Sequence, residues 1–562
     1  MESPLQAPEL MNSRVINGDL LALAAWCAGK LALIRLYGAS LVRLAGRSGP
    51  RSHRNHKGLM RNREPSEGLN DGVSPTESIS GREESVLLER PTPVEPPPTQ
   101  GSPTQFSDQL AISAQQEERL LEMFFDVVQD VNPIFSRARF FHSYRNSTRS
   151  RELISTIVLI TAKLSRYAFP MNGHVLDACI DQLLSSSLLD GDMFGDSPTL
   201  DQFRKACLLA FYEFHQYPGN QSWMRIGKLT RMAYRIGLDR LETIRSFYPD
   251  WSSISREDIE EWRSVWWCIY RLDSYSNLSS GTPYLIDEKL INTALMAGLH
   301  AQEIFLPPQS GDLWKLIREV TSNPETLLMN VHTITATAMR QAGLILRVHS
   351  LQAREKTISH LADVECHIST LRQALPPGWL NPSRNAFSNE SHVDHHARLV
   401  TVLHLRMAQL LLAVLNCGKG EESEWLMSWQ QVLEASQDIA SIAGQWDSSF
   451  CLKVDPAISF VLFTALIFLD LHKKSTAISI SNLVSSIDHH MTVLRLQLEQ
   501  FAHIWTLPKL LALSFETFSE SVSGPLSDRQ ITFILSRFEA PLHPRWLRFL
   551  SSTKEDLESS PM

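Results

Sequence analysis

The 562-residue sequence contains only seven cysteines, and no two of them form a Cys-x-x-Cys pair. Such pairs are the common ligand arrangement of structural zinc sites. An odd number of widely separated cysteines also excludes a disulfide framework and favours a reducing compartment, the cytosol or the nucleus. The seven are Cys27, Cys179, Cys207, Cys268, Cys366, Cys417 and Cys451.

Motifs for catalysis and phosphate binding are missing as well. The sequence has no glycine-rich phosphate loop, no Gly-x-Ser-x-Gly nucleophile motif and no protein-kinase signature. We therefore predict that the chain is not an enzyme, and we assign it no catalytic, cofactor-binding or metal-binding residue. The net charge of −8 excludes a general nucleic-acid binder, so any attraction to phosphate must come from a local basic patch.

Histidines cluster in three places without a metal-binding pattern. His392 and His396 can share a helical face, but the metalloprotease motif needs a glutamate directly after the first histidine, and Val393 stands there. We interpret this cluster, and the pair His489-His490, as polar helix surface. His404 lies in an apolar stretch, which is typical of a hydrogen-bonded core histidine.

Long uninterrupted apolar runs are also absent near the N-terminus. Residues 20–45 are apolar, but Lys30, Arg35 and Arg43 interrupt them, whereas a membrane-spanning helix needs about 20 mostly uncharged residues. Three interpretations remain: a helix that docks on the body or an artefact of the gene model, a targeting or membrane-surface segment, and a membrane anchor. We treat residues 1–48 as an apolar and basic segment with at most one helix.

Residues 49–110 are predicted to be a disordered linker, first basic and then rich in proline, serine and glutamate. Such a composition cannot bury enough apolar surface to offset the entropy of ordering. The basic part is a candidate nuclear-import or phosphate-contacting arm, and the alternative is a solvated linker. The arm consists of Arg43, Arg47, Arg51, Arg54, Lys57, Arg61 and Arg63.

From residue 111 the pattern is helical, and we expect an all-α domain over residues 111–515 and a tail with short helices over residues 516–562. Ser113 and Gln116 predict a capping box at the first helix. Residues 201–217 and 221–236 predict a helix pair, and Gly237 a left-handed C-cap.

The most aromatic stretch runs from Ser255 to Asp287. Ser255 predicts a helix N-cap. Trp262, Trp266 and Leu272 recur at helical spacing, with Val265 and Ile269 on the same face, and Trp267 and Tyr270 widen the apolar stripe. Each large aromatic buries roughly 150–250 Å², so the helix is predicted to be central. Gly281 then permits a turn, and Pro283 prevents the helix from resuming at once.

This stretch resembles the fungal-specific transcription factor domain, the middle homology region that lies downstream of binuclear zinc-cluster DNA-binding domains. In that family a charged lead-in precedes a Trp-Trp pair, an aromatic residue, a Leu-Asp and a Gly-Arg-Pro turn. The preceding segment 223–240 resembles the family too, and the likeness extends from Ser113 to about Leu513. Thr282 and Asp239 depart from the usual Arg and His. The candidate signature residues, which we interpret as structural, are Trp223, Gly227, Arg231, Gly237, Arg263, Trp266, Trp267, Tyr270, Asp273, Gly281, Pro283 and Asp287.

The resemblance implies a nuclear transcription regulator of a metabolic or secondary-metabolite gene set. The family's zinc cluster needs six cysteines, but only Cys27 precedes the linker, so we expect no zinc cofactor in this chain. DNA contact is then expected to be indirect, or to use an N-terminal module lost from the gene model. Expected partners are other transcription regulators, a small-molecule effector and a second copy of the chain. The alternatives are a co-regulator without DNA binding and a helical enzyme or small-ligand-binding protein.

Overall fold

The computed structural model describes most of the chain from residue 112 onward. The described ranges are 112–129, 133–165, 173–185, 198–298, 302–306, 312–351, 355–384, 390–417, 422–476 and 481–550. The contacts divide the chain after Glu95, and every described residue belongs to the second part, Pro96–Met562. The predicted segment 1–48, the linker 49–110 and the basic arm from Arg43 to Arg63 lie outside the described residues.

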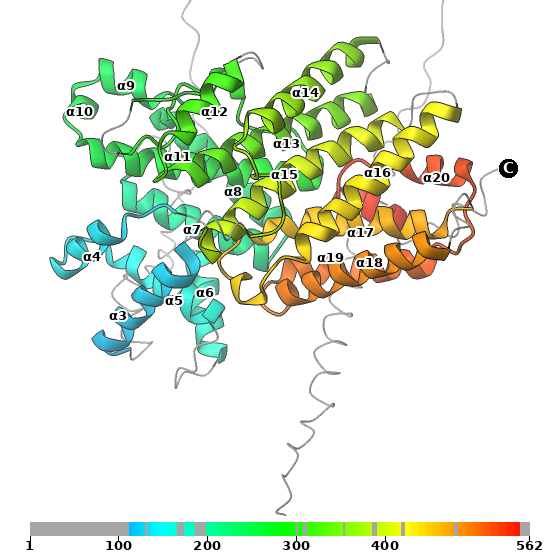
Figure 1. The fold of residues 1–562 in the computed structure, drawn as a ribbon. Helices are drawn as coiled ribbons and strands as arrows, with labels where there is room; N and C mark the ends of the chain where they lie inside the picture. Colours follow the sequence, from blue (N-terminus) through cyan, green and yellow to red (C-terminus); the bar gives the residue numbers. More distant parts are fainter. Residues whose placement is uncertain are drawn as a thin grey trace, which may run out of the picture. The chain divides into compact units, whose positions relative to one another are not determined.

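Across these ranges the chain forms helices and connecting turns (Figure 1). Apart from an isolated pairing of Ser475 with Leu526, they contain no β-structure. The prediction of an all-α fold is confirmed. The α-helices up to the aromatic stretch are α3 (Ala114–Met123), α4 (Arg137–Arg145), α5 (Arg151–Ser165), α6 (Gly173–Ser185), α7 (Leu200–Gln216), α8 (Asn220–Ile236), α9 (Leu241–Phe247), α10 (Pro249–Ser252) and α11 (Arg256–Ser280).

The second set of helices begins after a long connection that contains the short 3₁₀ helix η4 (Glu288–Leu290). It comprises α12 (Leu313–Thr321), α13 (Leu327–Leu351), α14 (Glu355–Ala374), α15 (His392–Asn416), α16 (Glu422–Ala443), α17 (Ser459–Lys474), α18 (Ser481–Ala502), α19 (Thr506–Ser521) and α20 (Asp528–Leu535).

Local sequence signals set several helix ends where the sequence predicts them. Ser113 and Gln116 form the capping box of α3, and the side chain of Ser255 accepts a hydrogen bond from the backbone N–H of Asp258 at the start of α11. The predicted helix pair is α7 and α8, and Gly237 ends α8 in the left-handed conformation, with φ of 78°. These local predictions are confirmed.

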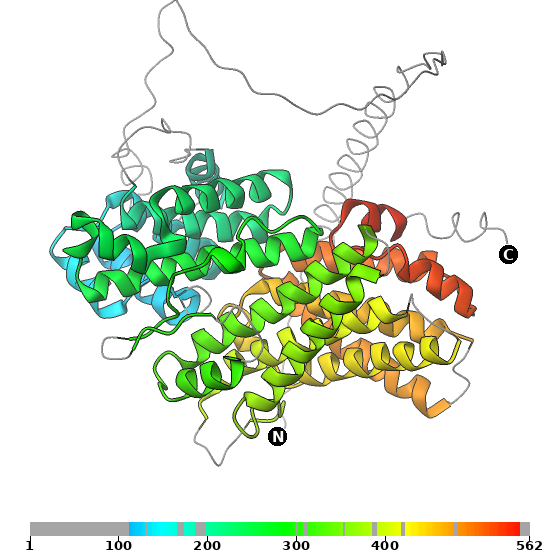
Figure 2. The same cartoon turned by 90° about the horizontal axis from the view of Figure 1, so that it is seen from above.

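Helix α13 connects two groups of helices. On one side it packs against α11, which in turn packs against α7 and α8. On the other side it packs extensively against α15, and α16, α17, α18 and α19 follow in successive contacts (Figures 1 and 2). The buried apolar side chains of both groups belong to one continuous core.

Two helices of the second group are apolar enough to cross a membrane by length and composition. In α15 and in the stretch Pro456–Lys474, which contains α17, 83% and 94% of the most apolar window is buried inside the protein. Their apolar surface is therefore satisfied by the neighbouring helices, and both are core helices.

The chain beyond residue 515 also contributes to this core. Helix α19 runs across that position, and Phe518, Ile531 and Trp546 are buried. The backbone N–H of Leu542 donates to the carbonyl of Ser279 at the end of α11, 2.7 Å away. The described part of the tail thus extends the domain, and it packs beside the glycine-proline turn.

Candidate functional site

The three tryptophans of α11 lie in the core. Trp262, Trp266 and Trp267 are 8%, 0% and 3% exposed. Trp267 donates its indole N–H to the carbonyl of Ala294, 2.8 Å away, and the Trp266 ring contacts the Tyr234 ring edge to face, with centroids 5.9 Å apart. The prediction of a central helix with buried indoles is confirmed.

A buried guanidinium anchors the first half of α11. Arg263 is 1% exposed and donates to Glu242 and Glu303, each 2.7 Å away, and to Glu260 one turn earlier. Burial raises the pKa of Glu242. Glu260 also accepts the backbone N–H of Ala297 at 3.2 Å. The Arg263 cluster therefore ties α11 to α9 and to the connection that follows η4.

A buried carboxylate anchors the second half of α11. Asp273 is fully buried and accepts hydrogen bonds from Asn277 at 2.7 Å and from the backbone N–H groups of Leu285 and Ile286 at 3.1 and 3.2 Å. Its charge partner is Arg340 in α13, 2.8 Å away. Asp273 thus folds the segment after the turn back onto the helix.

Arg340 is the functional residue that the sequence analysis missed. Its guanidinium also donates to Glu288 at 3.0 Å and to the carbonyl of Ile286, and it lies over the rings of Tyr284 and Tyr270 at 4.0 and 4.9 Å. It is 67 residues away from Asp273 in the chain. The sequence feature that could have indicated Arg340 is its position in the middle of the mostly apolar helix α13. A charged residue in a buried helix needs a partner of opposite charge.

The turn after α11 fits glycine for two reasons. Gly281 has φ of 67°, and a Cβ atom there would lie 3.0 Å from the His543 ring and 3.1 Å from the Ala540 Cβ. Thr282, which stands where the family usually has arginine, donates its hydroxyl to the Asn277 side chain at 2.6 Å. The corner is thus closed by short polar side chains and by the C-terminal segment.

The other signature residues surround this corner. Trp223 is 36% exposed and donates its indole N–H to Asn277 at 3.1 Å. A Cβ atom on Gly227 would touch Leu285 at 3.5 Å. Asp287 is exposed and caps η4 by accepting the backbone N–H of Lys289 at 3.0 Å. Arg231 is exposed on α8.

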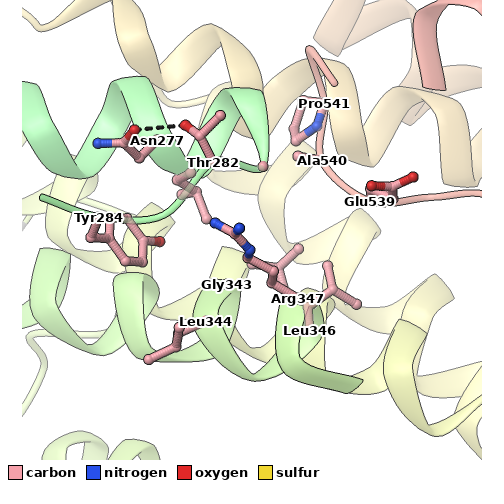
Figure 3. A pocket seen from close by; sticks show the side chains of 13 residues that line it. Asn277, Thr282, Tyr284, Gly343, Leu344, Leu346, Arg347, Glu539, Ala540 and Pro541 are labelled. Carbon is pink, nitrogen blue, oxygen red and sulfur yellow. Dashed lines mark hydrogen bonds between the residues drawn. The ribbon is translucent and has the colours of Figure 1, made fainter. Parts of the chain in front are cut away.

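A small pocket lies where the corner, α13 and the C-terminal segment meet. Figure 3 shows the Asn277–Thr282 hydrogen bond on one side, Leu344 and Arg347 of α13 below it, and Glu539 to Pro541 across from them. Its cavity of about 20 Å³ has room for about one water molecule. This pocket is too small for an effector.

The histidine clusters are engaged within the protein. The ring nitrogens of His396 contact the carbonyl of His392 at 2.6 Å and the backbone N–H of Asp447 at 3.0 Å. His404 is fully buried between the hydroxyls of Tyr275 at 2.7 Å and Thr335 at 3.1 Å, and burial lowers its pKa to about 3. Within the described ranges, no group of three or more His, Cys, Asp or Glu side chains is arranged to hold a metal ion.

The cysteines in the described part of the chain do not fit a binuclear zinc cluster. Five are buried in the core, where two of them, Cys207 and Cys268, contact each other, and Cys366 is exposed. A shared two-zinc site needs thiolates that converge within one small module.

Comparison with known proteins identifies the helical domain. Residues 121–361 match the model of the fungal specific transcription factor domain. Over these residues the chain is similar to that family's domain. The matched stretch contains α11, the glycine-proline turn and Arg340.

The chain is also similar to several curated transcription regulators, some of them activators of biosynthesis. The chain is 24% identical over 208 residues to the pigment biosynthesis transcriptional activator pigB of Monascus ruber, which covers 35% of this chain and 36% of the relative. It is 24% identical over 379 residues to the citrinin biosynthesis transcriptional activator ctnR of Monascus purpureus, covering 64% and 62%. It is 24% identical over 184 residues to the transcription factor tazR of Aspergillus terreus, covering 32% and 28%.

Each of these alignments spans less than two thirds of the relative's own length. The relatives are transcription regulators and not enzymes, which agrees with the sequence prediction. No solved structure matches the chain.

Proposed function

We propose that this protein regulates transcription in the nucleus and controls a secondary-metabolite gene set. The observation that carries the proposal is that residues 121–361, which contain the buried ion pairs of Asp273 and Arg263, match the fungal specific transcription factor domain. The names of the relatives, activators of pigment and citrinin biosynthesis, supply the class of target genes.

In this proposal the helical domain is the regulatory part. Helix α13 carries Arg340 and packs on both α11 and α15. A shift of the glycine-proline turn would therefore move α13 as a rigid element, and α13 would displace the second group of helices. Other transcription regulators, a second copy of the chain and a small-molecule effector are the partners that such a domain would engage.

DNA contact has two proposed routes, neither using a zinc ion held by the described cysteines. In the first route, an upstream zinc-cluster module binds DNA, and in the second a partner protein supplies the contact. The basic arm from Arg43 to Arg63 can add nonspecific attraction to phosphate in either case. Sequencing the 5′ end of the transcript separates the routes, because six in-frame upstream cysteines would eliminate the second.

The function is tested by mapping the genomic occupancy of the tagged protein and profiling expression after deletion of its gene. We expect occupancy at promoters of one biosynthetic gene set and reduced expression of those genes in the deletion strain. A mobility-shift assay with the purified chain then distinguishes direct from partner-mediated binding. Absence of promoter enrichment together with unchanged expression would exclude a regulatory role.

A further inference from the structure

A second pocket lies between η4, α12, α13 and α14. Its cavity of about 90 Å³ is several times the size of the one beside the corner. It is also adjacent to the family signature, because Glu288 in its wall directly follows Asp287. None of the signature residues lines it.

Four of the nine residues that line the pocket are aliphatic. Leu306 comes from the connection before α12, Leu313 and Leu316 from α12 itself, and Ile334 from α13. Leu313, Leu316 and Ile334 are buried, whereas Leu306 is partly exposed. Such a wall favours an apolar ligand body, as in most small-molecule sites.

The opposite end of the pocket is polar, with Thr337, Gln341 and Glu288. Gln341 donates one amide hydrogen to Glu288 at 3.0 Å. An amide side chain has two donors and a carbonyl oxygen that can accept, so Gln341 can hydrogen-bond a hydroxyl or a carbonyl group of a ligand.

The charges at this end are balanced inside the protein. Glu288 is paired with Arg340 at 3.0 Å and also accepts the Tyr270 hydroxyl at 3.1 Å. Lys289 is exposed to water, and burial lowers the pKa of His367, so that ring is neutral at pH 7. A cationic ligand would therefore lose its hydration here without gaining an unpaired carboxylate, and an anionic one would meet a positive charge only at the water-exposed Lys289.

We propose that this pocket binds a small, uncharged, mainly aliphatic molecule whose single hydroxyl or carbonyl group bonds to Gln341. A dry cavity of about 150 Å³ holds benzene. By proportion, the cavity here encloses roughly four non-hydrogen atoms, so it suits a molecule of about that size.

The position of the pocket gives the ligand a route to the turn. Gln341 and Arg340 are neighbours in α13, both contact Glu288, and Arg340 also holds Asp273. Binding at Gln341 therefore biases the arrangement of the ion pair that fixes the corner. This effector role rests on the proposed regulatory function, whereas the binding itself does not.

The binding is tested with four probes of one carbon skeleton: butan-1-ol, butan-2-one, butanoate and butylammonium. Saturation-transfer NMR on the purified full chain measures the dissociation constant of each probe. We expect millimolar binding of the alcohol and the ketone, and at least tenfold weaker binding of both ions. Equal or tighter binding of either ion would overturn the proposed ligand class.

Two substitutions place the binding in this pocket. Leu306→Trp places a larger side chain in the pocket wall and is expected to weaken alcohol binding at least tenfold, with the neighbouring exposed Phe305→Trp as its control. Gln341→Leu removes the polar contact and is expected to weaken it about 2- to 12-fold, which corresponds to one net hydrogen bond of about 0.5–1.5 kcal/mol. Its control is Gln409→Leu, because Gln409 is also half-buried with one side-chain hydrogen bond, from Arg406.

If no uncharged probe binds, or if Leu306→Trp binds butan-1-ol as tightly as Phe305→Trp does, the pocket proposal is wrong. The samples for these measurements contain no DNA, so such a result would not contradict the proposed transcriptional role. Conversely, a failure of the occupancy experiment would leave a measured binding constant unaffected.

Discussion

Helices α11 and α17 are both almost completely buried, yet they are held in different ways. The buried face of α11 includes Glu260, Glu261, Arg263 and Asp273, each with a partner on another element. Ten of the fourteen buried residues of α17 are apolar, and Asp470 pairs with Lys474 at 2.6 Å on the same helix. One helix is fixed by particular charge pairs and the other by the filling of volume.

The family match falls on the part of the chain that contains α11 and not on the part that contains α17. Neither partner of a buried ion pair can be replaced alone, because the remaining buried ion without a partner destabilises the fold. An apolar core accepts many combinations that keep the volume and the pattern. The family model covers residues 121–361, the part with the Arg263 cluster and Asp273–Arg340, and ends before α15 and α17.

The largest expected effect comes from removing one partner of the Asp273–Arg340 pair. Asp273→Ala should lower the free energy of unfolding by about 3–5 kcal/mol, because it leaves a buried guanidinium without its carboxylate. Chemical denaturation measures the loss. The matched control is Asp126→Ala, which breaks the exposed ion pair between Asp126 and Arg137. These two side chains are 59% and 52% exposed, so the loss of the pair should lower the free energy of unfolding by at most about 1 kcal/mol.

A double-mutant cycle completes this test. Combining Asp273→Ala with Arg340→Met should cost clearly less than the sum of the two single changes, because no buried charge is then left alone. Additive costs would mean that the ion pair is not what holds the turn.

The second expected effect contrasts the two helices directly. Leu466 in α17 is fully buried, so Leu466→Ala should cost about 2–5 kcal/mol and the volume-conserving Leu466→Met less than about 1.5 kcal/mol. Arg340→Lys keeps the charge but loses the planar fork that reaches Asp273, Glu288 and Ile286. If Arg340→Lys proves milder than Leu466→Met in denaturation, the contrast between the helices fails.

The same contrast explains what the sequence could predict. The helix ends at Ser113, Gly237 and Ser255 follow from local capping chemistry, and the burial of Trp266 follows from periodicity. These features depend on residues only a few positions apart in the chain, so the local sequence pattern predicts them.

The partners across the fold could not be predicted in this way. Periodicity states which face of α11 is buried, but not that Arg340 lies opposite Asp273, nor that Glu242 and Glu303 surround Arg263. The packing of the C-terminal segment on Gly281 was also invisible, because nothing local in Ala540 or His543 indicates a contact so distant in the chain.

Acidification should weaken the second group of helices, because both histidines concerned lie in it. Burial lowers the pKa of His404 and of His472 to about 3 from an ordinary value of 6.5. Below pH 6.5 the unfolded chain takes up protons that the folded chain does not, so stability falls as the pH falls toward 3. At pH 5 each histidine should cost about 2 kcal/mol relative to pH 7, measured as the change in unfolding free energy.

His472 allows a clean variant, because its ring stacks on Trp429 with centroids 3.6 Å apart and phenylalanine preserves that shape. His472→Phe should remove about 2 kcal/mol of the pH dependence between pH 7 and pH 5. His489→Phe, at an exposed position of α18, is the control for replacing a histidine by phenylalanine. An unaltered pH profile in His472→Phe would show that this buried ring does not titrate as described.

The smallest expected effect concerns the backbone at the corner between the two groups. Gly281→Ala must adopt a φ of 67° and bring its Cβ to about 3 Å from the His543 ring and the Ala540 Cβ. The left-handed conformation alone costs an L-residue about 1–2 kcal/mol. Gly444→Ala is the control, since a Cβ there would meet its neighbours at ordinary distances of 3.5 Å or more.

Because Gly281 contacts the C-terminal segment and Asp273 holds the other side of the turn, Gly281→Ala should loosen residues 540–543 before α11 itself. Hydrogen exchange of the Leu542 amide, which donates to Ser279, measures this order; equal protection loss along α11 would contradict it.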